Sequence, residues 1–148
     1  MNEIKEIIKE KRLAGIDYGL KRVGFAVCDE FHITVTPKCT FQRQSTNFWQ
    51  ELMEAIKNNN IGALVVGVPF GYEQKRSNIA KDVLKFIEEL KKRTDLKIIP
   101  FDESFSSYEA MNTMIKIGKK KKKRAVKETK DMIAAAVILR SFLQEIEG

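Results

Sequence analysis

The sequence predicts an α/β protein with one mixed five-stranded sheet and helices on both faces. Three short apolar segments come first, with no helical pattern between them, over residues 12–17, 22–29 and 32–41. Apolar segments at 61–69 and 96–103 then alternate with stretches of helical periodicity. Three leading antiparallel strands followed by parallel strands with connecting helices account for this order.

The leading segments predict a hairpin and a third strand. RLAGID (12–17) and RVGFAVCD (22–29) flank a tight polar turn, as two antiparallel strands do. The second strand places three large side chains on one face and three small residues on the other: Val23, Phe25 and Val27 against Gly24, Ala26 and Cys28. Pro37 in the third segment predicts an edge strand or a bulge.

Four helices are expected in the rest of the chain. The first lies within 45–60, where Ser, Thr and Asn residues are capping candidates and four side chains have helical spacing: Trp49, Leu52, Met53 and Ile56. This spacing makes Trp49 a core residue. The second, over about 77–93, presents one apolar stripe: Ile79, Val83, Phe86, Ile87 and Leu90. Two more are expected near 105–117 and from about 127 to 146, and IGALVVGVP (61–69) is typical of a parallel strand covered on both faces.

Composition limits the partner and the compartment. The chain has 27 Lys and Arg against 20 acids, a formal charge of +7 that favours a polyanionic partner. No stretch approaches the roughly 20 apolar residues of a membrane span, and the charged first segment does not resemble a signal peptide. Cys28 and Cys39 are expected to be reduced core residues of a cytoplasmic protein, without a zinc site. We expect residues 1–11 to be an N-terminal extension and 12–148 a single domain.

Three acids are candidates for chemistry. Asp17 ends the first strand and Glu103 the fifth, and the right-handed crossover rule brings these ends to the edge where ligands bind in α/β sheets. Asp131 is expected in or near the first turn of the last helix. Each has an ordinary alternative: helix capping at 102–104, or the helix dipole for Asp131. If the three converge, a hard cation relieves their repulsion, and Mg²⁺ ions can then drive in-line phosphodiester hydrolysis.

A run of basic residues, KKKKKR, occupies positions 119–124. Such runs are often only solvated. This one lies inside the domain and not on a tail, which favours contact with a nucleic-acid backbone.

Four segments, in order, resemble the YqgF (RuvX-like) family of nucleases, which has a ribonuclease H-like fold. GIDYGLKRVGFAVCD is similar to its opening strand and turn, and VVGVPFG to its GLP loop. FDESFSSYEA resembles its DER…EA segment, and KKRAVKETKDMIAAAVIL its basic loop and closing helix. The resemblance covers nearly the whole chain after about residue 12.

The resemblance implies a site and a reaction. Asp17, Glu103 and Asp131 match the family's catalytic acids, which bind Mg²⁺ or Mn²⁺. The phosphate contacts it implies are Lys21, Arg22, Arg76, Lys119, Lys120, Lys121, Lys122, Lys123 and Arg124. The implied function is processing of the 5′ end of pre-16S rRNA in ribosome biogenesis, or resolution of Holliday junctions in DNA. A monomer would suffice for the first, and a homodimer suits the second.

Two positions depart from the family pattern. Leu20 stands where a Thr or Ser is common, and Ser104 replaces the usual arginine of DER, for which Arg76 could substitute. Two other classes remain open. Actin-like ATPases share a GID-x-G loop, but they need two such domains and a hydroxyl where Leu20 stands. A non-catalytic RNA- or ribosome-binding module fits the charge, but gains nothing from acids beside phosphates.

Overall fold

The computed structural model describes residues 2–69, 78–103 and 123–147. These contain a five-stranded sheet in the order β3-β2-β1-β4-β5. Its strands are β1 (Arg12–Tyr18), β2 (Arg22–Cys28), β3 (Val35–Gln42), β4 (Ile61–Val68) and β5 (Lys97–Asp102). β2 is antiparallel to β1 and β3, whereas β4 is parallel to β1 and β5 to β4. The predicted mixed sheet is confirmed.

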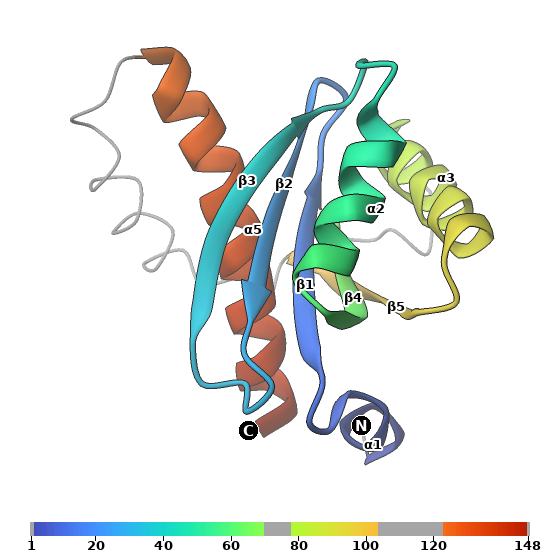
Figure 1. The fold of residues 1–148 in the computed structure, drawn as a ribbon, viewed down its shortest axis with the longest axis vertical. Coiled ribbons are helices and arrows are strands. Elements are labelled where there is room, and N and C mark those ends of the chain that lie inside the picture. The colour runs from blue at the N-terminus through green and yellow to red at the C-terminus, as the bar shows by residue number, and fades with distance from the viewer. Residues whose placement is uncertain (1, 70–77, 104–122, 148) are drawn as a thin grey trace.

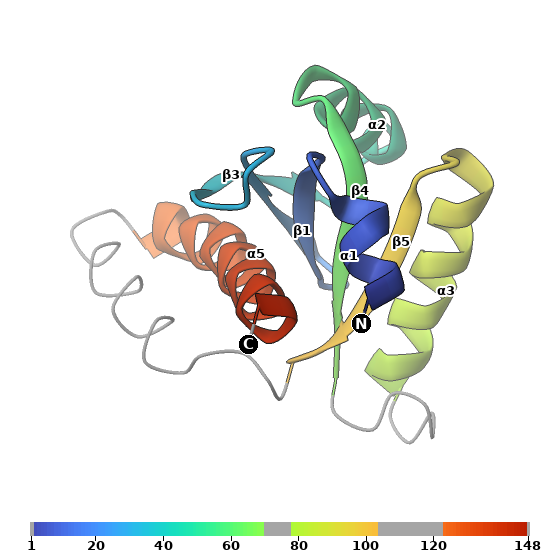
Figure 2. The same ribbon diagram turned by 90° about the horizontal axis from the view of Figure 1, so that it is seen from below.

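Helices cover both faces of the sheet, as predicted (Figures 1 and 2). The described helices are α1 (Asn2–Ile8), α2 (Phe48–Asn58), α3 (Asn78–Arg93) and α5 (Lys123–Glu147). Figure 2 shows α5 on one side of the sheet and α2 and α3 on the other. Ile8 of α1 joins the core beneath α5, so the N-terminal helix is docked on the domain. Within the described residues, no helix is both long and apolar enough to cross a membrane.

The two faces of β2 are as different as its alternation predicts. Val23, Phe25 and Val27 belong to the core under α2 and α3. On the opposite face, small residues let α5 approach the sheet closely, since a Cβ atom on Gly24 would overlap the backbone carbonyl oxygen of Asp131. This close approach determines where α5 delivers its side chains.

β3 is an edge strand and contains a bulge. Ala26 pairs with Pro37 and Phe25 with Cys39, so one residue of β3 is left without a partner between them. Pro37 has no N–H to donate, and a bulge at the sheet edge accommodates it. Both predictions for this proline are confirmed. Cys28 and Cys39 are free thiols, the first buried and the second partly buried.

Three expectations need correction. Ile79 is 39% exposed, and Ala80 takes its place on the buried side of α3. Trp49 is only partly buried, because Phe48 supplies the deeper anchor of α2. No side chain caps α2, although Asn47 occupies the N-cap position. The helix expected near 105–117 lies outside the described residues.

Candidate active site

Asp17 and Glu103 meet at the end of the sheet where the parallel strands β1, β4 and β5 finish. Asp17 is the penultimate residue of β1, and Glu103 directly follows β5. β4 lies between these strands, where a Cβ on Gly67 would stand only 3.1 Å from Oε1 of Glu103. The absence of a side chain at Gly67 therefore leaves room for the Glu103 carboxyl group to reach across β4. The two carboxyl groups are close enough for each to shift the pKa of the other.

Asp131 comes to the same region from α5. It is the ninth residue of that helix, so the explanation by a first-turn helix dipole is wrong: that effect falls off within the first turn. Asp17 pairs across the sheet with Gly24, and the α5 backbone at Asp131 packs directly on Gly24. Register and close packing thus bring the third acid near the first.

The site carries excess negative charge. Asp17 keeps partial solvent access but is surrounded by protein on most sides. Burial, and then the charges of Glu103 and Asp131, raise the pKa of Asp17 to about 8. Burial also raises the pKa of Glu103, with a further contribution from the charge of Asp102, while its interaction with Asp17 opposes the rise. Near neutral pH the pair therefore shares a proton.

Arg22 neutralises part of this charge. Its Nε donates to Oδ2 of Asp131 at 2.6 Å, with the two side chains 30% and 23% exposed. Arg22 is the first residue of β2 and follows the hairpin turn that connects it to the strand carrying Asp17. Arg22, which was predicted to contact phosphate, therefore lies in the site, and its guanidinium is paired with the carboxylate of Asp131.

The donor set suits a hard cation, but the acids are not yet arranged as a three-ligand site. Among the described residues, no group of three or more His, Cys, Asp or Glu side chains could hold a metal ion as it stands. In this structure the Asp131 carboxylate is paired with Arg22 instead. Asp17 and Glu103 already supply adjacent carboxyl oxygens, the ligands that Mg²⁺ prefers.

The other predicted contact residues are placed only in part. Lys21 is exposed in the β1–β2 turn. Arg76, Ser104 and positions 119–122 lie outside the described residues, as do the side chains of Lys123 and Arg124 at the start of α5. One further cation, Arg43, lies one residue beyond β3 at the same edge of the sheet as Asp17. Arg43 was not among the predicted contacts, although its position directly after a strand that ends here was an available signal.

A mixed sheet of this order with helices on both faces is the ribonuclease H-like fold. Solved structures of Thermus thermophilus RuvC share the fold. One, in complex with a Holliday junction substrate, has a TM-score of 0.55 at 16% identity and covers 93% of this chain and 96% of its own. A second has a TM-score of 0.50 at 15% identity.

Sequence comparison identifies the family within this class. Residues 11–145 match the family model described as RuvX: Holliday junction resolvase. A relative from Amoebophilus asiaticus, named "Putative pre-16S rRNA nuclease", is 38% identical over 133 residues, covering 89% of this chain and 93% of the relative. A relative from Sulfurihydrogenibium with the same name is 34% identical over 137 residues, covering 91% of each chain. The chain belongs to the RuvX family, which confirms the resemblance and the nuclease class.

Proposed function

We propose that the chain is a divalent-metal-dependent nuclease that processes the 5′ end of pre-16S rRNA. The observation that carries the chemistry is the close Asp17–Glu103 pair with Asp131 near it, because grouped carboxyl groups are costly without a cation. The names of the curated relatives support the choice of substrate. Processing of ribosomal RNA would place the protein in the cytoplasm.

Asp17, Glu103 and Asp131 are the proposed metal ligands, with Mg²⁺ or Mn²⁺ as the ion. All three offer oxygen donors only, which suits these hard cations and not zinc. Bound there, the metal would activate the attacking water and stabilise the leaving oxygen of the phosphodiester.

The protein groups have separable parts in this reaction. Asp17 and Glu103 would release their proton to solvent, and both carboxylates could then serve as charged ligands. Arg22 is paired with Asp131, and were that carboxylate to bind the metal, the guanidinium would be free to donate to a phosphate oxygen. Arg22 would therefore release the Asp131 carboxylate and bind a phosphate of the substrate when metal and substrate are bound.

Cleavage of branched DNA is the second candidate, favoured by the description of the family model that matches the chain. Two symmetric cuts in a junction need two active sites, so this function would require a dimer. RNA trimming needs only one site, and a monomer suffices.

Cleavage of end-labelled substrates tests the proposal. The substrates are an RNA spanning the 5′ end of 16S rRNA, a single-stranded DNA and a four-way junction, each with Mg²⁺, Mn²⁺ or EDTA. The variant Asp17→Asn removes a ligand, and Asp95→Asn, an exposed acid before β5, is its matched control. Metal-dependent cutting of the RNA that is lost only in Asp17→Asn supports the proposal. Preferred cutting of the four-way junction would instead favour the second candidate function, cleavage of branched DNA. Equal cutting by all proteins, or binding without cutting, would overturn the proposal.

A further inference from the structure

Arg43 lies against an aromatic platform formed by Tyr18, Phe48 and Trp49. Its guanidinium carbon is 4.8 Å from the ring centroid of Phe48, 5.7 Å from that of Trp49 and 5.8 Å from that of Tyr18. Its Nε also donates to the Tyr18 hydroxyl at 3.3 Å. The rings restrict the guanidinium by packing and by cation–π attraction. Little side-chain freedom then remains to be lost when a ligand binds.

The platform leaves the outer nitrogens of Arg43 open. Among the described residues, no carboxylate forms an ion pair with Arg43, and its only side-chain hydrogen bond is the one to Tyr18. A guanidinium stacked on rings, with its terminal N–H groups unused, suits bidentate recognition of a phosphate. Phe48 and Trp49 begin α2, so the positive end of that helix dipole lies close by.

Arg43 lies at the same end of the sheet as the acids, where β1, β4 and β5 finish, but on the opposite face of the sheet. Its N–H donates to the carbonyl of Lys21 at 2.9 Å, which fastens the segment after β3 to the β1–β2 turn. Side chains alternate along β1, so Tyr18 packs on Phe86 of α3 while Asp17 faces Asp131 of α5. Arg43 is thus near the acids along the edge but is not one of the groups around the bond to be cut.

We propose that Arg43 binds a backbone phosphate flanking the scissile one, and so holds the nucleic-acid strand where it crosses the edge of the sheet. The inference rests on the proposed function for the identity of the strand as substrate. Binding to Arg43 itself needs only a phosphodiester backbone, of RNA or DNA, and can be measured without metal or cleavage.

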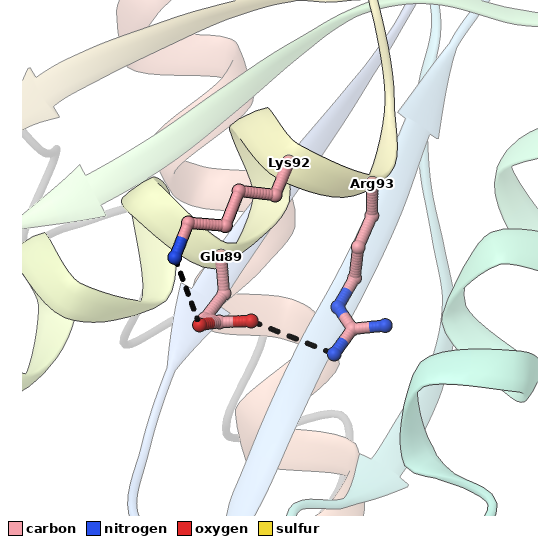
Figure 3. A network of polar contacts seen from close by, with 3 residues as sticks. All are labelled: Glu89, Lys92 and Arg93. Atoms are coloured by element: carbon pink, nitrogen blue, oxygen red, sulfur yellow. Dashed lines mark hydrogen bonds and ion pairs between the residues drawn. The ribbon is translucent and has the colours of Figure 1, made fainter.

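Arg93 offers a matched control for the platform. Its guanidinium lies 4.3 Å from the ring centroid of the same Trp49. Unlike Arg43, it is paired with a carboxylate, Glu89, at 3.5 Å, and Lys92 approaches the same carboxylate at 3.8 Å (Figure 3). Arg93 is the last residue of α3, and its guanidinium is already engaged by the carboxylate of its own helix. Its loss removes a similar ring contact but no proposed phosphate contact.

The experiment measures binding in EDTA by fluorescence anisotropy over a range of salt concentrations. The probes are a labelled RNA spanning the 5′ end of 16S rRNA and a labelled four-way DNA junction. We expect Arg43→Gln to raise the Kd for the preferred probe roughly tenfold, the usual effect of one charged hydrogen-bonding contact. The slope of log K against log salt should fall by about 0.7–0.9, one phosphate contact. Arg93→Gln should change neither quantity.

Each outcome decides between phosphate binding and a structural role. An unchanged salt slope in Arg43→Gln, or equal losses in Arg93→Gln, would assign the platform to stability and overturn the inference. If thermal unfolding shows that Arg43→Gln does not fold, Arg43→Lys is measured instead. A higher Kd with the wild-type salt slope supports the inference, and an unchanged Kd overturns it. If the wild type binds through Arg43 but cuts no substrate, the proposed function fails and the binding inference stands.

Discussion

Replacing Asp17 by Asn should stabilise the metal-free protein, increasingly so as the pH rises. The folded protein holds a proton at Asp17 up to a pKa of about 8, whereas the ordinary pKa of an aspartate side chain is 3.8. Between these values the folded state binds more protons than the unfolded chain, so the free energy of unfolding falls as the pH rises. The stability that protonated Asp17 contributes to the folded state is complete below about pH 4 and is lost above about pH 8. Asn cannot deprotonate, and the variant should lose this dependence.

The magnitude follows from the width of that window. One proton corresponds to a slope of about 1.4 kcal/mol per pH unit, and a window of about four pH units sets an upper bound of roughly 6 kcal/mol. Partial solvent access at Asp17 reduces this, so we expect Asp17→Asn to be more stable than the wild type by about 2 kcal/mol at pH 8. Near pH 4 the two should be nearly equal.

Urea unfolding measures this directly. The single tryptophan, Trp49, packs between Phe48 and Phe86 and reports the transition by fluorescence. Wild type, Asp17→Asn and the control Asp95→Asn are unfolded in EDTA at several pH values between about 4 and about 8.5, a range that spans the expected window. Mg²⁺ should restore stability at high pH in the wild type and in the control, but not in Asp17→Asn. Parallel pH profiles for wild type and Asp17→Asn would refute the reasoning.

Two further predictions concern the helix that supplies Asp131. Gly24→Ala places a methyl group against the α5 backbone and should lower the free energy of unfolding by about 3 kcal/mol, measured in urea. Gly62→Ala, whose added methyl meets side-chain carbons of Lys11 at 2.9–3.1 Å and no backbone atom, should cost less, and equal losses would contradict the packing argument. Arg22→Gln frees Asp131 and removes a cation, so Mn²⁺ should bind more tightly, by up to about fivefold in a calorimetric titration. Weaker binding would show that Arg22 supports the metal site.

The order of strands and helices was predictable because it depends on local pattern. Alternation along β2 predicted which residues face each core, and Pro37 predicted both the edge and the bulge. The start of α5 was predicted too late, which placed Asp131 in a first turn. Ile79 shows the limit of periodicity, since a residue near a helix end can have the right spacing and still be exposed.

The sequence by itself determined the sheet, its order of elements and the acids at the strand ends, because periodicity and turn chemistry act over a few neighbouring residues. Only the tertiary structure decided how those acids are held. Arg22 and Asp131 are separated by 109 positions, and their ion pair depends on α5 packing against a glycine of β2. The platform beneath Arg43 likewise joins side chains of β1 and α2. Contacts of this kind arise from the packing of distant segments, which no local pattern specifies.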